Sequence, residues 1–328
     1  MLLSSCVDSN QKHNKIKVYT SSSKKQSRGI GSQKSKVLAI LPMSGVHKNL
    51  GRDVLNSCLL SIDEYKNIEM LLVDSAWINT APEKISDIVQ KYDIKYIIGP
   101  VFGYESIKMK GIAPYSTCFS LSNNYTIAHE KNIICGITPS TETIALLNYA
   151  ANNGIKRILA IVPKNEYGNA INKILDSAKD DNEVYVRKIR YTKFSEDIIE
   201  EQLEDSNFDA ILVCEQISKI TKDHGIPYLV PYRFAKSSVM PKKCKVFTAS
   251  PDKQNLDSFR KFFKANFGKE PSDISMVGYD VSNLVFSMTV NGYDKSRLLS
   301  KRFHGVLGDF DISRKGVIRR NWRIYEWK

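Results

Sequence analysis

The sequence predicts an α/β protein of two similar lobes, each with a parallel sheet between layers of helices. Short apolar runs alternate with segments of helical apolar spacing, which is typical of parallel strands joined by helices. The alternation breaks at residues 133–137 and then begins again, and this predicts a second lobe. With 328 residues, of which 42% are hydrophobic, the chain is long enough to fill two cores.

The middle of the chain shows how one strand-and-helix unit is built. Thr138 can cap a helix through its side chain, and Glu142 places negative charge near the positive end of the helix dipole. Gly154 can adopt the left-handed conformation that ends this helix. Residues 157–162 then form an apolar strand, and the loop 163–168 leaves its carboxyl end. Site residues are expected there, because this end faces the ligand crevice in open α/β sheets.

The other elements follow the same rule from Lys36 onward. In the first lobe we expect strands at residues 36–42, 68–73, 94–98 and 115–121, with helices at 49–64, 82–92 and 104–110. In the second lobe we expect strands at residues 158–162, 183–190, 210–214 and 227–231, with helices at 139–153, 169–179, 196–203 and 217–223.

The last part of the chain predicts a return to the first lobe. A strand at 246–250 is followed by two helices, 256–267 and 277–290. Because no second-lobe strand is left for these helices to cover, we expect them to pack on the first lobe. Residues 303–327 alternate between polar and apolar side chains, as in a terminal hairpin.

The first 35 residues predict a disordered basic tether. The net charge is +13, but residues 1–36 hold eight Lys or Arg and one acid, which leaves only +6 for the rest. Such a composition is typical of a solvated linker, and it favours an anionic membrane or cell-wall surface over nucleic acid. We therefore expect no nucleic-acid partner.

Met1 to Cys6 resembles the end of a bacterial lipoprotein signal, with Leu3 and two small residues before Cys6. We therefore expect lipidation at Cys6 and a periplasmic protein anchored to a bacterial membrane. The charged start and apolar core of such a signal do not precede the box, so Met1 is a late start or the sequence is trimmed. The alternative is a chance cysteine in a disordered tail.

The remaining cysteines predict no metal site. Cys58, Cys118, Cys135, Cys214 and Cys244 lie in or beside apolar segments, and no spacing matches zinc ligands. They are expected to be small buried hydrophobic residues, with one disulfide as the alternative in an oxidising compartment. No cofactor motif is present.

Several stretches resemble type I periplasmic binding proteins, the leucine-binding fold of solute receptors, from Lys36 to the C-terminus. These are VLAILPMSG, IIGPVFGYES, FSLSNN, GITPSTE, GYDVSNLVF and FHGVLGDFDISRKGVIRR. The SNN stretch, the Pro in IVPKNEYG and the lipoprotein start most resemble the penicillin-binding-protein activator lipoproteins of the LppC type. One departure is that residues 215–232 are short for the last α/β unit of lobe two.

The resemblance implies two lobes joined by three hinge crossings, near residues 133–137, 249–250 and 305–308, with any ligand between them. Lobe 1 would then comprise residues 36–135 and 250–305. Lobe 2 would comprise residues 136–249 and 306–328, the latter forming a closing hairpin.

The resemblance also implies where a ligand would bind. In solute receptors of this fold, first-lobe loops offer backbone N–H groups and hydroxyls to a carboxylate, and the second lobe supplies an aromatic wall and an acid. Carried over by motif, the candidates are Tyr104, Ser106, Ser120, Ser122 and Asn123 in lobe 1, and Tyr167 and Glu215 in lobe 2.

Each candidate also has a structural interpretation. The Tyr167 ring could only pack its loop, and Glu215 could only be solvated. Ser122 and Asn123 could satisfy the backbone of a turn.

The sequence does not indicate an enzyme. The Ser-x-x-Lys spacing at residues 21–24 lies in the tail, where no packed environment would activate a lysine. No phosphate loop, HExxH motif or nucleophile elbow occurs. The first hypothesis is therefore a lipoprotein that regulates peptidoglycan synthesis through contact with a peptidoglycan synthase (a penicillin-binding protein). The alternative is the solute-binding receptor of an ABC transporter, with an amino acid or small peptide-like ligand.

Overall fold

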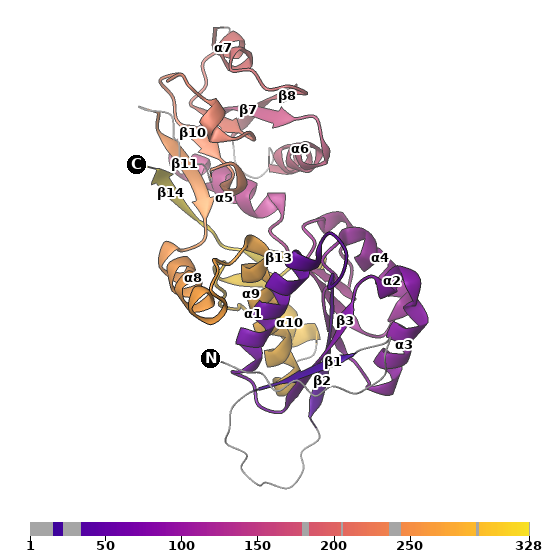
Figure 1. Ribbon diagram of the computed structural model, residues 1–328. Helices are drawn as coiled ribbons and strands as arrows, with labels where there is room; N and C mark the ends of the chain where they lie inside the picture. Colours follow the sequence, from indigo (N-terminus) through magenta and orange to yellow (C-terminus); the bar gives the residue numbers. More distant parts are fainter. Residues whose placement is uncertain are drawn as a thin grey trace. The chain divides into compact units, whose positions relative to one another are not determined.

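The computed structural model describes residues 16–21, 34–178, 184–204, 206–235, 244–292 and 295–327. They form two compact units (Figure 1). Unit 1 lies within Met1–Ile137 and Gln254–Arg320, and unit 2 lies within Thr138–Lys253 and Asn321–Lys328. Each unit contains a six-stranded, mostly parallel sheet, so the predicted α/β fold with two lobes is confirmed.

The sheet of unit 1 has the strand order β1-β3-β2-β4-β5-β6. Its strands are β1 (Lys17–Thr20), β2 (Ser35–Leu41), β3 (Ile68–Asp74), β4 (Tyr96–Ile98), β5 (Thr117–Ser120) and β6 (Asn132–Ile134). All neighbouring strands pair in parallel except β1, which runs antiparallel to β3. The carboxyl ends of β2 to β6 therefore meet at one edge of the sheet.

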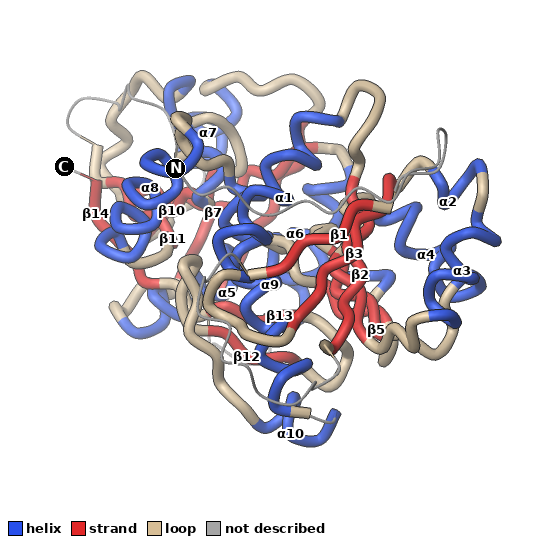
Figure 2. Tube along the Cα trace, turned by 60° about the horizontal axis from the view of Figure 1, so that its bottom comes forward, coloured by secondary structure: helices blue, strands red, loops and turns tan. Residues whose placement is uncertain are grey.

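Helices cover both faces of this sheet, as Figures 1 and 2 show. They are α1 (Lys48–Ile62), α2 (Trp77–Thr80), α3 (Pro82–Lys91), α4 (Gly103–Ile112), α8 (Lys253–Phe267), α9 (Asp273–Asn291) and α10 (Lys295–Ser300). Alternate residues of β2 separate the two faces: Val37 and Ala39 pack with α1 and α9, while Leu38 and Ile40 pack with α3 and α4. The helices beyond residue 250 contribute Leu256, Val281 and Leu298 to the core of unit 1.

Strand β1 departs from the disordered tether expected for residues 1–35. Tyr19 is only 8% exposed and belongs to the same core as α1, while Ile16 and Val18 pack on the opposite face. Successive side chains of a strand point to opposite faces of the sheet, so the adjacent Val18 and Tyr19 give each face an apolar side chain. Cys6 lies outside the described residues.

The sheet of unit 2 has the order β14-β11-β10-β9-β7-β8. Its strands are β7 (Arg157–Pro163), β8 (Tyr185–Tyr191), β9 (Ala210–Val213), β10 (Tyr228–Val230), β11 (Val246–Ser250) and β14 (Arg323–Trp327). Only β14 is antiparallel to its neighbour. The helical elements are α5 (Pro139–Asn152), α6 (Glu166–Ala178), α7 (Asp197–Glu204) and the 3-10 turns η2 (Ile217–Lys219) and η3 (Tyr232–Phe234).

Helix α5 starts where the sequence predicts, but Thr138 does not cap it through its side chain. The Thr138 hydroxyl lies 2.7 Å from the Ser140 hydroxyl and accepts no backbone N–H of the helix. Pro139 still fits the first turn, because its missing N–H would have had no intrahelical partner.

The chain passes between the units at residues 137/138, 253/254 and 320/321. The third passage lies beyond the expected 305–308, because the hairpin β12 (Phe310–Ile312) and β13 (Ile318–Arg320) packs in the core of unit 1. Only β14 of the C-terminal segment joins unit 2.

A buried ion pair fixes this hairpin in unit 1. The Asp280 carboxylate accepts from Val306 N (2.6 Å), Leu307 N (3.3 Å) and Arg320 Nη1 (3.0 Å), and both charged side chains are fully buried. Arg320 Nη2 also donates to the Cys135 carbonyl at 3.1 Å. One ion pair therefore links three segments that are far apart in the sequence.

The five described cysteines are free thiols. Cys58, Cys118, Cys135 and Cys214 are buried, as predicted, whereas Cys244 is half-buried. Burial raises the pKa of Cys58 and of Cys118 to about 12, so both remain neutral and pack as small hydrophobic groups. No helix within the described ranges is both long and apolar enough to cross a membrane.

Candidate functional site

In unit 1, three of the candidate serines meet at the carboxyl edge of the sheet. Ser106, in the first turn of α4, and Ser120, at the end of β5, have their hydroxyl oxygens 2.6 Å apart. The Ser106 hydroxyl oxygen also lies 3.1 Å from the Phe102 carbonyl oxygen, and the Ser120 hydroxyl oxygen lies 3.3 Å from the Pro100 carbonyl oxygen. Because each hydroxyl has one proton, one serine donates to the other, which in turn donates to its carbonyl. The three hydroxyls are buried, so their bonds hold the loop after β4 against the end of β5.

Ser122 serves the backbone of its own turn. Its hydroxyl accepts the N–H of Asn124 at 3.1 Å, and its own N–H donates to the Ser120 hydroxyl at 3.3 Å. Asn123 is exposed beside it. The candidate residues of the FSLSNN stretch thus lie together, but their buried hydroxyls are bonded within unit 1.

Tyr104 lies on the surface of unit 1. It is 57% exposed, and its ring stacks on Phe102 with centroids 5.8 Å apart. The centroids of the Phe102 and His47 rings are 4.7 Å apart, so the rings of Tyr104, Phe102 and His47 form one continuous surface.

Glu105 is a polar residue of this edge that the sequence interpretation missed. It is only 4% exposed, and its Oε1 accepts from the Ser75 hydroxyl at 2.9 Å. Its Oε2 is buried and has no hydrogen-bond partner among the described residues. Burial raises the pKa of the Glu105 carboxyl, and the Ser75 bond offsets this in part. An acid in the first turn of a helix is normally interpreted as a partner of the helix dipole. For this reason the sequence did not indicate that the Glu105 carboxyl is buried.

In unit 2, Tyr167 at the start of α6 is enclosed by residues of the η3 turn. The Arg233 guanidinium lies 4.3 Å from the centre of the Tyr167 ring, and the Phe234 ring meets it edge-on at 5.4 Å. The Tyr167 hydroxyl oxygen is buried without a hydrogen-bond partner in the described part of the chain. Burial raises the pKa of Tyr167 well above its ordinary value, so the phenol stays neutral.

Glu142 joins this cluster from α5. Its carboxylate is fully buried and accepts from Arg233 Nε at 3.4 Å and Arg233 N at 3.3 Å. Thr143, next in the helix, has a buried hydroxyl with no partner among the described residues. Glu142 was predicted only as a helix-dipole residue, and Arg233 lies outside every motif, so the pair, 91 residues apart, could not be predicted.

The carboxylate of Glu215 bonds to residues outside the Tyr167 cluster. Its carboxylate accepts from the Tyr191 hydroxyl (3.3 Å) and from Gln216 N (2.8 Å), and it pairs with Lys219 at 3.1 Å. The side chain is 16% exposed, so it is neither freely solvated nor unpaired.

These side chains provide recognition groups. Within the described residues, no three His, Cys, Asp or Glu side chains gather as a metal site. The carboxyl edge of the unit 1 sheet offers hydroxyls and an aromatic surface. The carboxyl edge of the unit 2 sheet offers the Glu142–Arg233 pair, whose carboxylate is buried.

No protein-family model matches the sequence, and no curated protein matches it either. Solved structures do match. The C-domain of LpoA from Haemophilus influenzae, a regulator of PBP1A, has a TM-score of 0.71 at 15% identity, over 90% of this chain and 98% of that chain.

Two solute-binding proteins are similar as well. A putative branched-chain amino acid ABC transporter protein from Rhodospirillum rubrum gives a TM-score of 0.72 at 12% identity, over 89% of this chain and 100% of that chain. The solute-binding protein of an ABC transporter from Rhodopseudomonas palustris, in complex with 3,4-dihydroxybenzoic acid, gives a TM-score of 0.60 at 20% identity. The match covers 90% of this chain and 93% of that chain. The chain therefore has the type I periplasmic binding protein fold, as the sequence predicts.

Proposed function

We propose that this protein is a non-enzymatic periplasmic regulator of peptidoglycan synthesis, which acts through contact with a peptidoglycan synthase of the penicillin-binding-protein class. The observation that carries the proposal is that most polar candidate side chains are already bonded within their own unit. A solute that took the hydroxyls of Ser106 and Ser120 would have to break those bonds. Exchanging one hydrogen bond for another yields a net gain of only about 1 kcal/mol or less.

The exposed face of unit 1 is suited to protein contact. The Tyr104 ring stacks on Phe102, the His47 ring is tilted against Phe102, and the neighbouring Val46 side chain is 92% exposed. Exposed aromatic side chains with limited rotamer freedom are typical anchors of protein interfaces. The similarity to the C-domain of LpoA, a regulator of PBP1A, supports the same class of partner.

The test is a binding titration of the full chain with a detergent-solubilised peptidoglycan synthase. We expect a complex at micromolar concentration and faster glycan polymerisation or cross-linking when it forms. Tyr104→Ser should weaken the complex by about tenfold, as loss of an interface anchor does. Tyr115→Ser removes another exposed tyrosine of unit 1 and should leave the affinity unchanged. Absence of a complex at micromolar concentration would contradict the proposal.

A solute-binding receptor of an ABC transporter is the second candidate, and one observation favours it. The buried oxygens of Tyr167 and Thr143 have no partner among the described residues, so polar atoms of a ligand could satisfy them. A ligand that binds only the folded state, present at about 100 times its Kd, stabilises that state by about 2.7 kcal/mol. Melting curves with amino acids, small peptides and aromatic acids would reveal such a ligand.

Lipid anchoring at Cys6 belongs to the same proposal. The cysteine would carry the lipid, and the basic residues that follow would favour an anionic surface. Expression with its natural upstream codons should place the chain in the membrane fraction, and Cys6→Ser should release it to the soluble fraction. Equal fractionation of both forms would rule out the anchor.

A further inference from the structure

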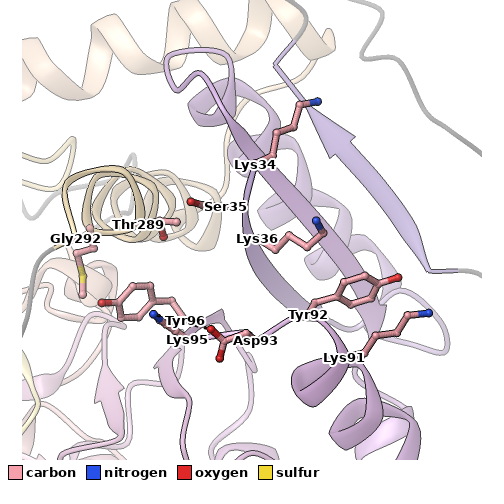
Figure 3. A pocket seen from close by; sticks show the side chains of 11 residues that line it. Lys34, Ser35, Lys36, Lys91, Tyr92, Asp93, Lys95, Tyr96, Thr289 and Gly292 are labelled. Carbon is pink, nitrogen blue, oxygen red and sulfur yellow. Dashed lines mark ion pairs between the residues drawn. The ribbon is translucent and has the colours of Figure 1, made fainter. Parts of the chain in front are cut away.

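A cavity of about 610 Å³ lies in unit 1 at the amino ends of strands β2 and β4, away from the edge described above. Figure 3 shows its lining, which comes from the start of β2, the end of α3, the start of β4 and the end of α9. The charged side chains among the lining residues are Lys34, Lys36, Lys91, Lys95 and Asp93. Four lysines therefore line the cavity. Figure 3 shows Lys34, Lys36 and Lys91 pointing away from the end of α9, and Lys95 beside Tyr96.

The lysines are only partly neutralised by nearby carboxylates. Lys34 and Lys36 share the carboxylate of Glu69, at 3.6 Å and 3.1 Å, and Lys95 lies 4.0 Å from Asp93. Lys36 and Lys91 both approach the Tyr92 ring, at 5.6 Å and 5.3 Å from its centre. An anion placed among these groups would relieve the repulsion between ammonium groups that share one carboxylate or one ring.

Helix ends reduce this positive charge without cancelling it. Four lysines less the carboxylates of Asp93 and Glu69 leave two positive charges. The C-terminal ends of α3 and α9 each contribute about half a negative charge, so about one positive charge remains.

The donors suit an anion such as phosphate. The described lining of this cavity contains no arginine, so lysines supply its cationic donors. Lysines act as point charges with rotatable donors, which suits a tetrahedral phosphate. The hydroxyls of Ser35 and Thr289 add neutral donors to the same lining.

A second cavity, of about 420 Å³, adjoins the first and shares Asp93, Lys95, Tyr96 and Met288 with it. Its lining is largely apolar, with contributions from Ile94, Ile133, Leu298, Leu299 and the 90% exposed Tyr115. Lys131, Arg314 and Glu130 also line it, which adds one net positive charge. The two cavities together offer cationic donors beside an apolar surface.

We propose that these cavities bind a phosphate-bearing amphiphile, with the phosphate among Lys34, Lys36 and Lys91 and the hydrocarbon part in the adjoining apolar cavity. This site lies apart from the aromatic surface proposed for the synthase, so either proposal can fail alone. The phosphate supplies charge pairing, and the hydrocarbon gains from burial.

Calorimetric titration of the full chain with methyl phosphate and octyl phosphate tests the phosphate site and the apolar cavity. Octyl phosphate should bind at least about tenfold tighter, since burial of only two methylene groups gives that factor. The double variant Lys36→Gln/Lys91→Gln should weaken both ligands by about tenfold, as expected for lost charge-assisted bonds. Leu299→Ser should weaken octyl phosphate only.

The matched control is Lys173→Gln/Lys261→Gln, which removes the same two charges from exposed helical positions and leaves the basic tail intact. It should bind both ligands as the unchanged chain does. Equal weakening in both double variants, equal affinity for the two phosphates, or no saturable binding at about 10 mM would each overturn the proposal.

Discussion

The two units finish the carboxyl edges of their sheets in different ways. In unit 1, short hydroxyl side chains bond to one another and to loop carbonyls, and Ser120 alone contacts three groups. In unit 2, the longer side chains of Glu142, Arg233 and Tyr167 meet, and buried oxygens of Tyr167 and Thr143 remain unpartnered within the described residues. The edge of unit 1 is thus largely closed by its own bonds, whereas hydrogen-bonding capacity remains in unit 2.

Of the contacts at the two edges, the Arg233–Glu142 pair of unit 2 should contribute most to the free energy of unfolding. Arg233→Ala removes the guanidinium from the buried carboxylate of Glu142, and breaking a fully buried pair in this way costs about 3–5 kcal/mol. Because the Arg233 side chain is 31% exposed, we expect a loss of about 2–3 kcal/mol in the free energy of unfolding. Urea denaturation measures it. Arg233→Lys keeps the positive charge and should lose less free energy of unfolding than Arg233→Ala. Equal losses in the two variants would show that the charge does not determine the effect.

The serine cluster of unit 1 should give the next largest effect. Ser120→Ala removes the hydroxyl that contacts Ser106, the Pro100 carbonyl and Ser122 N. We expect a loss of about 1–2 kcal/mol, because buried partners are left unsatisfied. Ser140→Ala removes a hydroxyl that bonds to the Thr138 hydroxyl, and serves as the control. An unchanged free energy of unfolding in Ser120→Ala would mean that this edge is not closed by its own bonds.

Glu105 is the exception in unit 1, because its buried Oε2 has no hydrogen-bond partner among the described residues. It should make the free energy of unfolding depend on pH. Burial raises the pKa of its carboxyl above the ordinary 4.5, so the folded chain holds this proton more tightly than the unfolded chain. The resulting stabilisation is fully present below pH 4.5 and is lost as the pH rises through the raised pKa.

Glu105→Gln keeps an acceptor for Ser75 but cannot ionise. Its free energy of unfolding, relative to that of the unchanged chain, should therefore increase from below pH 4.5 towards neutral pH. Denaturation at a series of pH values measures this difference. A difference that stays constant with pH would show that Glu105 does not titrate in this range.

Tyr167→Phe should have the smallest effect on stability. The Tyr167 hydroxyl has no partner among the described residues, so its removal should change the free energy of unfolding by less than about 0.5 kcal/mol. The ring keeps its contacts with Arg233 and Phe234. A loss above about 1 kcal/mol would mean that the hydroxyl is bonded in solution.

The sequence was informative where pattern decides structure. Alternating strands and helices predict two sheets, and the resemblance places Ser106 and Ser120 among the ligand-cleft candidates. The sequence could not predict that the hydroxyls of Ser106 and Ser120 bond to each other, because this depends on how the first turn of α4 is placed against the end of β5. The Arg233–Glu142 pair depends on contacts between elements 91 residues apart. Strand β1 was overlooked because a strand of only four residues lies within a basic, polar segment.

If this fold recognises a protein surface, no solute should occupy the polar side chains at its strand ends. Native mass spectrometry of the full chain, purified from its native source, tests this most directly. We expect no amino acid or similar solute at stoichiometric level, and the same spectrum for Tyr167→Phe. A stoichiometric solute that is retained by the unchanged chain and lost in Tyr167→Phe would contradict the claim and establish the protein as a solute receptor.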